Sequence, residues 1–165
     1  MLHLYKYGLQ MHLPEGKLPG YYAQIVKAIA EKTVLFDRDK ELLIAETDSD
    51  REAMISIMDK YKVSHDFLDL LLLPENAQTD PLFSDYGFES KAGNRYLYAE
   101  QVVLYSIERG PSANAYDEEQ CNVQLSEHRI AFFSINGAAI FAADSQLIEL
   151  VQRIAKAYGM IAQLH

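Results

Sequence analysis

The densest group of potentially reactive side chains is a short run of carboxylates in the first half of the chain. Its four members occupy alternate positions: Glu46, Asp48, Asp50 and Glu52. Carboxylate oxygens are the ligands that Mg²⁺ and Ca²⁺ prefer, but acids also stabilise the positive end of a helix dipole. Because Ser49 and Glu52 have the spacing of a capping box, we interpret this run as the start of a helix and expect no metal there.

A second acidic pattern, Asp37-x-Asp39-x-Glu41, is similar to the beginning of a calcium-binding loop. Such a loop needs glycine at its sixth position, where this chain has Leu42, and it needs further oxygen ligands after that position. The chain becomes apolar instead, so we expect no calcium site. Residues 37–40 are interpreted as the polar turn of a hairpin.

The histidines and the cysteine match no common catalytic pattern. The five histidines form neither H-x-x-x-H nor H-E-x-x-H, so their spacing predicts no zinc site. A single cysteine, Cys121, excludes an internal disulfide and a zinc cage built from cysteines. Because Val123 and Leu125 continue an alternating pattern, we expect Cys121 to be buried in a strand. The sequence also lacks G-x-S-x-G and glycine-rich phosphate loops, which argues against α/β hydrolases and common nucleotide enzymes.

Tyrosines gather around an acidic run in the second half of the chain. Tyrosine is enriched at protein interfaces because it provides a large contact area at low entropic cost. Some of these tyrosines must be core residues, since Tyr96 and Tyr98 would point to one face of a strand. The residues that we predict to bind a partner are Tyr86, Tyr96, Tyr98, Tyr116, Asp117, Glu118 and Glu119.

The composition is that of an acidic globular protein. The 165 residues include 15 Lys and Arg against 24 Asp and Glu, a net charge of −9. A protein that neutralises nucleic-acid phosphates needs an excess of cations, so we expect no direct nucleic-acid binding. No apolar run approaches the roughly 20 residues of a membrane span, and the lone cysteine suits a reducing compartment. We expect a cytoplasmic protein without signal peptide, membrane contact or cofactor.

The clearest structural signal lies between residues 128 and 160. Asn136-Gly137 separates two apolar runs, and this pair is typical of a tight hairpin turn that needs positive φ. Asp144 or Ser145 can cap the following helix, and Gly159 can end it in the left-handed conformation. The sequence therefore predicts strand, turn, strand and helix in this region.

The rest of the chain is predicted as a mixture of strands and helices. Periodic apolar residues indicate a helix at residues 21–31 and another after Ser49. Residues 74–94, with their polar composition and two prolines, are predicted as a long loop of the kind that is often functional. Strands are predicted at residues 2–13, 33–36, 41–45, 65–73, 96–107, 121–125 and 161–164.

The two halves of the chain can be superposed with a shift of 97 residues, which places Pro14 on Pro111 and Tyr61 on Tyr158. Each half then reads as strand, connection, hairpin, helix and strand, a plan that resembles ferredoxin-like domains. One conflict remains, because residues 121–125 look like a strand where the superposition requires a helix. The fold class is predicted as α+β, with a mainly antiparallel sheet and helices on one face. We predict a single domain over residues 1–165, or a pseudo-repeat of residues 1–73 and 95–165 joined by the loop 74–94.

Three functions remain open. The favoured one is a non-enzymatic cytoplasmic protein that binds a basic protein, as an inhibitor, an immunity-like protein or a regulator. The second is a small-molecule-binding regulatory module, which could form a homodimer through sheet edges or helix faces. The third is an enzyme in which carboxylates and a histidine converge in a cleft. Its candidate residues are Glu46, Asp48, Glu100, His3, His12 and His128.

Overall fold

The computed structural model of the protein describes residues 3–17 and 19–165. The predicted fold class is confirmed, because the chain is a mixed α+β protein whose strands form two antiparallel sheets. The chain divides into two compact units. Whether they fold as the single domain that we predict stays a prediction. Unit 1 comprises Met1–Leu72 and Glu89–Tyr96, and unit 2 comprises Leu73–Phe88 and Leu97–His165.

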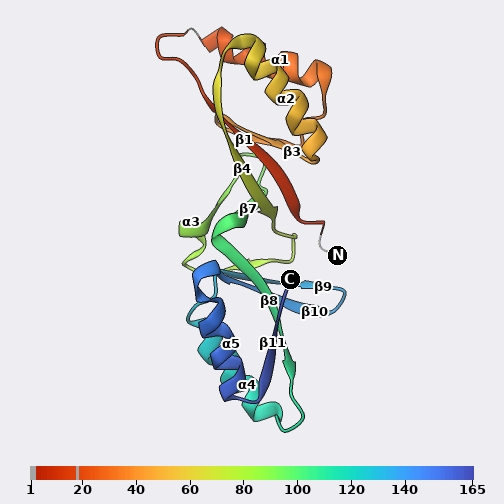
Figure 1. Ribbon diagram of the computed structural model, residues 1–165, viewed down its shortest axis with the longest axis vertical. Coiled ribbons are helices and arrows are strands. Elements are labelled where there is room, and N and C mark those ends of the chain that lie inside the picture. The colour runs from red at the N-terminus through yellow and green to blue at the C-terminus, as the bar shows by residue number, and fades with distance from the viewer. Residues whose placement is uncertain (1–2, 18) are drawn as a thin grey trace. The chain divides into compact units, whose positions relative to one another are not determined.

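Unit 1 follows the order strand, helix, strand, strand, helix, strand (Figure 1). The strands β2-β3-β1-β4 are consecutive neighbours in a six-stranded sheet, and each of these neighbouring pairs is antiparallel. The strand predicted at 2–13 is the central strand of this sheet; residue 2 lies outside the described part. The elements are β1 (Tyr5–His12), α1 (Pro19–Lys32), β2 (Asp37–Asp39), β3 (Leu42–Ala45), α2 (Asp48–Tyr61) and β4 (Ser64–Leu72).

The core of unit 1 lies between its sheet and its two helices. Alternate residues of β1 point to one face, and the apolar residues of α1 and α2 recur at helical spacing, so both helices cover that face. Burial of each large aliphatic side chain contributes about 1.5–3 kcal/mol. The buried residues of this core are Leu9, Met11, Ile25, Ile29, Leu43, Ala45, Met54, Ile57, Met58 and Val63.

Unit 2 repeats the same order of elements (Figure 1). Its sheet has the order β11-β8-β10-β9-β5, again with antiparallel neighbours. Its main elements are β8 (Val102–Arg109), α4 (Ala115–Ser126), β9 (Ala131–Ile135), β10 (Ala138–Asp144), η2 (Ser145–Leu147), α5 (Ile148–Ala157) and β11 (Met160–Leu164). The buried residues between helices and sheet are Tyr105, Cys121, Leu125, Ala143, Val151, Ile154, Ala155 and Met160.

The hairpin and helix predicted near the end of the chain are confirmed. Asn136 and Gly137 both have positive φ, 51° and 81°, and join β9 to β10. Gly159 has a φ of 69° and follows α5, as expected for a residue that ends a helix. The Asp144 side chain accepts a hydrogen bond from the backbone N–H of Gln146 at 2.8 Å, so the cap precedes a turn of 3₁₀ helix.

Both units therefore have the ferredoxin-like plan, and a shift of 97 residues carries β1 (Tyr5–His12) onto β8 (Val102–Arg109). The conflict at residues 121–125 disappears, because these residues lie in α4 and the strand predicted there was wrong. Asn114 and Asp117 form a capping box that begins α4. Cys121 and Leu125 are buried one helical turn apart. Two of the residues that suggested an alternating strand therefore face the core from one side of a helix.

Residues 73–101 contain more regular structure than the predicted loop. Asn76 donates a hydrogen bond to the backbone oxygen of Ser134 at 2.9 Å, and β5 pairs with β9, partners that are distant in the sequence. The single strand predicted at 96–107 was wrong, because a 3₁₀ turn divides it. The elements are β5 (Gln78–Thr79), α3 (Phe83–Tyr86), β6 (Gly87–Glu89), β7 (Arg95–Tyr98) and η1 (Ala99–Gln101).

Two local predictions in unit 1 also need correction. The hairpin turn lies at residues 40–41 and not at 37–40, because β2 is Asp37–Asp39 and Lys40 takes a positive φ of 52°. The cap of α2 is Thr47, whose side chain accepts a hydrogen bond from the backbone N–H of Asp50 at 3.1 Å. The Ser49–Glu52 pattern is therefore a coincidence of spacing inside the helix.

Candidate functional site

The tyrosines and acids that we predict to bind a partner are not all exposed at the surface. Tyr96 belongs to unit 1, and its side chain is completely buried. Its hydroxyl donates a hydrogen bond to Asp37 Oδ2 at 2.7 Å. Tyr96 is therefore a core residue and is removed from the candidate surface, because a buried side chain cannot contact a partner.

Tyr86 and Tyr98 are half-buried in unit 2. The Tyr86 hydroxyl donates to Asp144 Oδ2 at 2.6 Å, and this contact with a carboxylate raises the pKa of Tyr86. The bond connects α3 to the end of β10. The Tyr98 ring packs on Phe88 with the ring centroids 5.8 Å apart. Both tyrosines thus make internal contacts that stabilise unit 2, and each exposes part of its surface.

The acidic residues 117–119 lie in the first turns of α4. The Asp117 carboxylate accepts a hydrogen bond from the backbone N–H of Asn114, and the Asn114 side chain accepts one from the N–H of Asp117, both at 3.0 Å. Glu118 forms an ion pair with Arg109. Two of the three carboxylates therefore already have structural partners, which leaves Glu119 exposed on the helix.

One face of α4 combines apolar side chains with this acid. Tyr116 and Val123 are 67% and 58% exposed, among the most exposed large apolar side chains of the described residues. The spacing of three and four residues places Glu119 between them on the same side of the helix. We call Tyr116, Glu119 and Val123 the α4 face. Sequence reasoning missed Val123 because it was placed in a strand; helical spacing from Tyr116 would have found it.

A shallow hollow of about 560 Å³ lies beside the α4 face, and Glu119 and Val123 line it. Two arginines also line this hollow, and each is paired with an acid. Arg109 pairs with Glu118, and Arg129 donates to both oxygens of Asp80 at 2.8 and 3.2 Å. The cations of the hollow are thus neutralised by neighbours within unit 2.

Charge is distributed unevenly between the two units. Unit 2 holds 11 acidic and 4 basic residues, a net charge of −7, although it has barely half of the chain. Unit 1 holds 13 acidic and 11 basic residues, a net charge of −2. The negative field of the protein therefore originates mainly in the unit that carries the α4 face.

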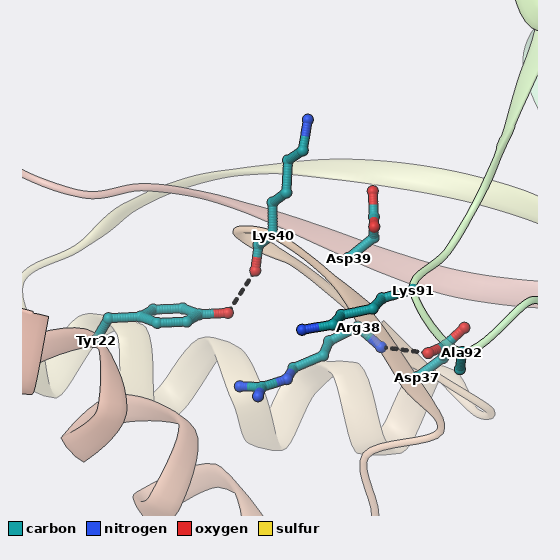
Figure 2. Close-up of a pocket in the computed structure, with 7 residues that line it drawn as sticks. All are labelled: Tyr22, Asp37, Arg38, Asp39, Lys40, Lys91 and Ala92. Carbon is teal, nitrogen blue, oxygen red and sulfur yellow. Dashed lines mark hydrogen bonds between the residues drawn. The ribbon is translucent and has the colours of Figure 1, made fainter.

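Asp37, predicted to lie in a turn, is a buried carboxylate at the start of β2. Its Oδ2 accepts hydrogen bonds from Ser90 Oγ at 2.7 Å, Asn94 Nδ2 at 2.9 Å and the Tyr96 hydroxyl at 2.7 Å. Its Oδ1 accepts one from the backbone N–H of Arg38 at 2.8 Å (Figure 2). Burial alone would raise the pKa of Asp37, but these four hydrogen bonds outweigh it and hold the pKa below the ordinary value. Asp37 is therefore ionised at neutral pH.

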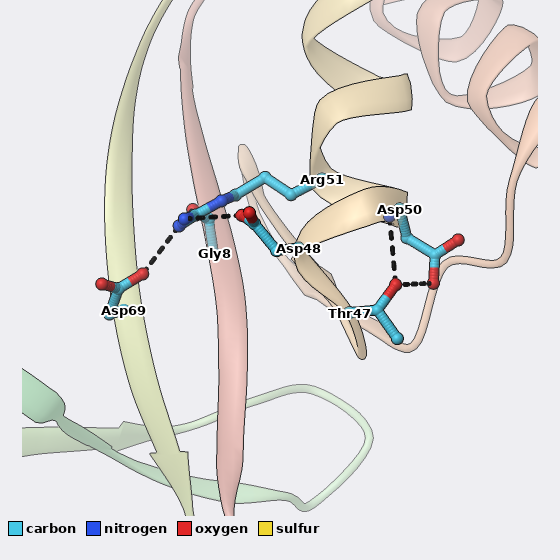
Figure 3. A network of polar contacts seen from close by, with 6 residues as sticks. All are labelled: Gly8, Thr47, Asp48, Asp50, Arg51 and Asp69. Carbon is cyan, nitrogen blue, oxygen red and sulfur yellow. Dashed lines mark hydrogen bonds and ion pairs between the residues drawn. The ribbon is translucent and has the colours of Figure 1, made fainter.

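The predicted acid cluster at the start of α2 also serves the fold. Arg51, 8% exposed, lies across the sheet and pairs with Asp48 at 3.1 Å and Asp69 at 2.7 Å (Figure 3). Its guanidinium carbon is 5.1 Å from the centre of the Tyr7 ring and 4.6 Å from that of Phe67. This network ties the first turn of α2 to β1 and β4. Asp50, in turn, accepts hydrogen bonds from Thr33 and Thr47, which lower its pKa, and Glu46 pairs with Lys6.

Among the residues that the structure describes, no hydrogen bond or ion pair joins the histidines to the acids proposed for an enzyme. His12 Nε2 lies 2.6 Å from Asp66 Oδ2 in an exposed pair, and His165 Nε2 lies 2.9 Å from Ser106 Oγ. Within residues 3–17 and 19–165, no three metal-ligating side chains lie close enough together to hold a metal ion. Cys121 is buried, and burial raises the pKa of its thiol, with a further rise from Glu118. None of the helices within the described residues is long and apolar enough to cross a membrane.

Comparison of the chain with protein-family models, curated proteins and solved structures finds no match. Function is therefore inferred from the two units and the side chains that they expose.

Proposed function

We propose that the protein binds a basic protein partner through the α4 face of unit 2, without catalysing a reaction. The observation that carries this proposal is the combination of exposed Tyr116 and Val123 with Glu119, which forms no ion pair within the described part of the chain, in a unit of net charge −7. The partner is expected to contribute lysine or arginine around an apolar centre. A lone buried cysteine suits a reducing compartment, so we place this interaction in the cytoplasm.

The α4 face has the arrangement that protein interfaces use. Aromatic side chains near the centre of an interface provide most of the binding energy, and surrounding polar groups determine which partner is accepted. Tyr116 would be the aromatic anchor, because most of its surface is open to solvent. The acids of α4 would attract a basic partner before contact, since charge complementarity raises the association rate.

The first experiment uses the full-length protein as bait in a cytoplasmic extract, followed by identification and purification of the protein that it retains. We expect a basic protein that the wild-type chain binds and that the Tyr116→Ala/Val123→Ser variant does not. Loss of an aromatic anchor costs about 2 kcal/mol, so the dissociation constant should rise roughly 30-fold, measured by titration calorimetry with the purified partner.

The electrostatic part is tested by association kinetics at increasing salt. Glu119→Gln should slow association, whereas the matched control Glu31→Gln, an exposed helical glutamate in unit 1, should leave it unchanged. A rate that does not respond to salt, or equal rates for both variants, would contradict a basic partner. Recovery of the protein's own chain alone would instead indicate the predicted homodimer and would also contradict the proposal.

A further inference from the structure

A hollow in unit 1 lies far from α4 in the sequence and has a different character. It measures about 700 Å³, within the range of small-molecule sites, and three segments line it. These segments are α1, which contributes Tyr22, the β2 strand and its turn, and the turn between β6 and β7. The lining residues are Tyr22, Asp37, Arg38, Asp39, Lys40, Lys91 and Ala92.

This hollow concentrates positive charge in an acidic protein. It contains Arg38, Lys40 and Lys91, and within the described part of the chain none of these cations takes part in an ion pair. Of the two acids in the lining, Asp37 is buried and its carboxylate already accepts four hydrogen bonds. The charges that remain open to a ligand are therefore mostly positive.

The side chains of Arg38 and Lys91 point into the same space beside the Tyr22 hydroxyl, while Lys40 and Asp39 point away from it (Figure 2). Two cations that share a space without an acid between them repel each other, and an anion bound there would remove that repulsion. Burial raises the pKa of Tyr22, and the Arg38 guanidinium, which points into the same space as the phenol (Figure 2), opposes the rise.

Internal hydrogen bonds hold both cation-bearing segments in place. The Tyr22 hydroxyl donates to the backbone oxygen of Lys40 at 2.5 Å and fixes the turn after β2. Ser90 and Asn94 flank Lys91, and both donate to Asp37 on the neighbouring segment. The backbones that carry Arg38 and Lys91 are thus held together before any ligand binds, which lowers the entropic cost of binding.

We propose that this hollow binds a small molecule that carries a phosphate group. The guanidinium of Arg38 can donate two parallel hydrogen bonds to phosphate oxygens, Lys91 adds a second cation, and the Tyr22 ring offers an apolar wall for the rest of the molecule. The site is independent of the α4 face, because each of its residues belongs to unit 1.

The test is a titration of the full-length protein with ADP, with inorganic phosphate and with citrate, followed by calorimetry and by amide chemical shifts. ADP is expected to bind saturably and to shift the amides of residues 38–40 and 91–92. The Arg38→Gln/Lys91→Gln variant should bind ADP at least about tenfold more weakly, since it loses both cationic donors to the phosphate.

The matched control is Lys27→Gln/Lys60→Gln, which removes the same charge from exposed positions on α1 and α2 and should bind ADP as the wild type does. Binding of inorganic phosphate in competition with ADP supports the proposal. Three results would overturn it: no saturable binding of ADP, equal weakening in both double variants, or citrate binding as tight as ADP binding. Because all the substitutions are exposed, thermal melts of the variants should match the wild type.

Discussion

The buried carboxylate of Asp37 is bonded to donors that lie 53 to 59 residues further along the chain. Such an arrangement stabilises the fold only while the carboxylate is ionised, because a protonated acid accepts fewer hydrogen bonds. The four bonds hold its pKa below the ordinary value of 3.8. Protonation of Asp37 at acid pH should therefore lower the folding stability of unit 1.

Replacing Asp37 by Asn should lower the free energy of unfolding by about 2–4 kcal/mol at neutral pH, because hydrogen bonds to a charged acceptor contribute about 1.5–3 kcal/mol each. The contribution of a carboxylate whose folded pKa is depressed is complete above its unfolded pKa and disappears as the pH falls through the folded pKa. Urea unfolding at a series of pH values should therefore show a constant difference above pH 3.8 that shrinks below it.

Asp39→Asn serves as the control, since Asp39 lies on the same strand and is half-buried. It should change the unfolding free energy little at any pH. An Asp37→Asn variant as stable as the wild type at pH 7 would show that the buried carboxylate does not stabilise unit 1.

At the scale of elements, the sequence predicts well wherever the cause of an element is local. Asn136-Gly137 joins β9 to β10 because these two residues accept positive φ, and no distant contact is needed. Helix α4 was missed because its apolar contacts are few: Cys121 and Leu125 are buried, while Tyr116 and Val123 face solvent. An amphipathic pattern was therefore too weak to distinguish it from a strand.

The turn offers a direct test of backbone strain. Gly137→Ala places a side chain at a φ of 81°, although no atom lies within 4 Å of the new Cβ. We expect a loss of about 1–2 kcal/mol in the unfolding free energy, because the left-handed conformation is costly for alanine. In Gly20→Ala the space is equally open and φ is not positive, so stability should be unchanged or slightly higher. Equal effects of the two substitutions in thermal or urea unfolding would argue against strain at the turn.

The candidate site was only partly predictable, because some of its features depend on contacts between segments that are distant in the sequence. Tyr116 and Glu119 were candidates by composition and stay predictions, and their place on the exposed face of α4 follows from helical spacing once the helix is known. Tyr96 could not be separated from them, since its burial depends on Asp37 in a distant segment. The cationic hollow was not predicted at all, because Arg38 and Lys91 meet through tertiary structure.

At the scale of the whole molecule, the same six-element plan occurs twice with a shift of 97 residues. The units are nevertheless not simple consecutive halves. The segment Glu89–Tyr96 belongs to unit 1, although the preceding segment Leu73–Phe88 belongs to unit 2. That segment supplies the three side-chain donors of Asp37. A domain boundary at residue 73 would therefore separate Asp37 from its three side-chain donors.

Two fragments test this dependence. The fragment 1–96 should melt cooperatively and should be more stable than the fragment 1–73 by about 2–4 kcal/mol, since the shorter one leaves the Asp37 carboxylate without its three side-chain donors. Introducing Asp37→Asn should destabilise fragment 1–96 and leave fragment 1–73 nearly unchanged, as in a double-mutant cycle. Circular dichroism melts would measure both, and equal stability of the two fragments would show that Glu89–Tyr96 is dispensable.

The position of the single cysteine has a practical consequence for measuring motion. Cys121 is fully buried on the core-facing side of α4 in unit 2, and unit 1 has no thiol. A thiol-specific reagent can modify the native protein only when α4 separates from the sheet, so its rate of reaction reports the opening of one unit alone. The rate of Cys121 modification therefore measures how often α4, the helix that we propose as the docking surface, opens transiently.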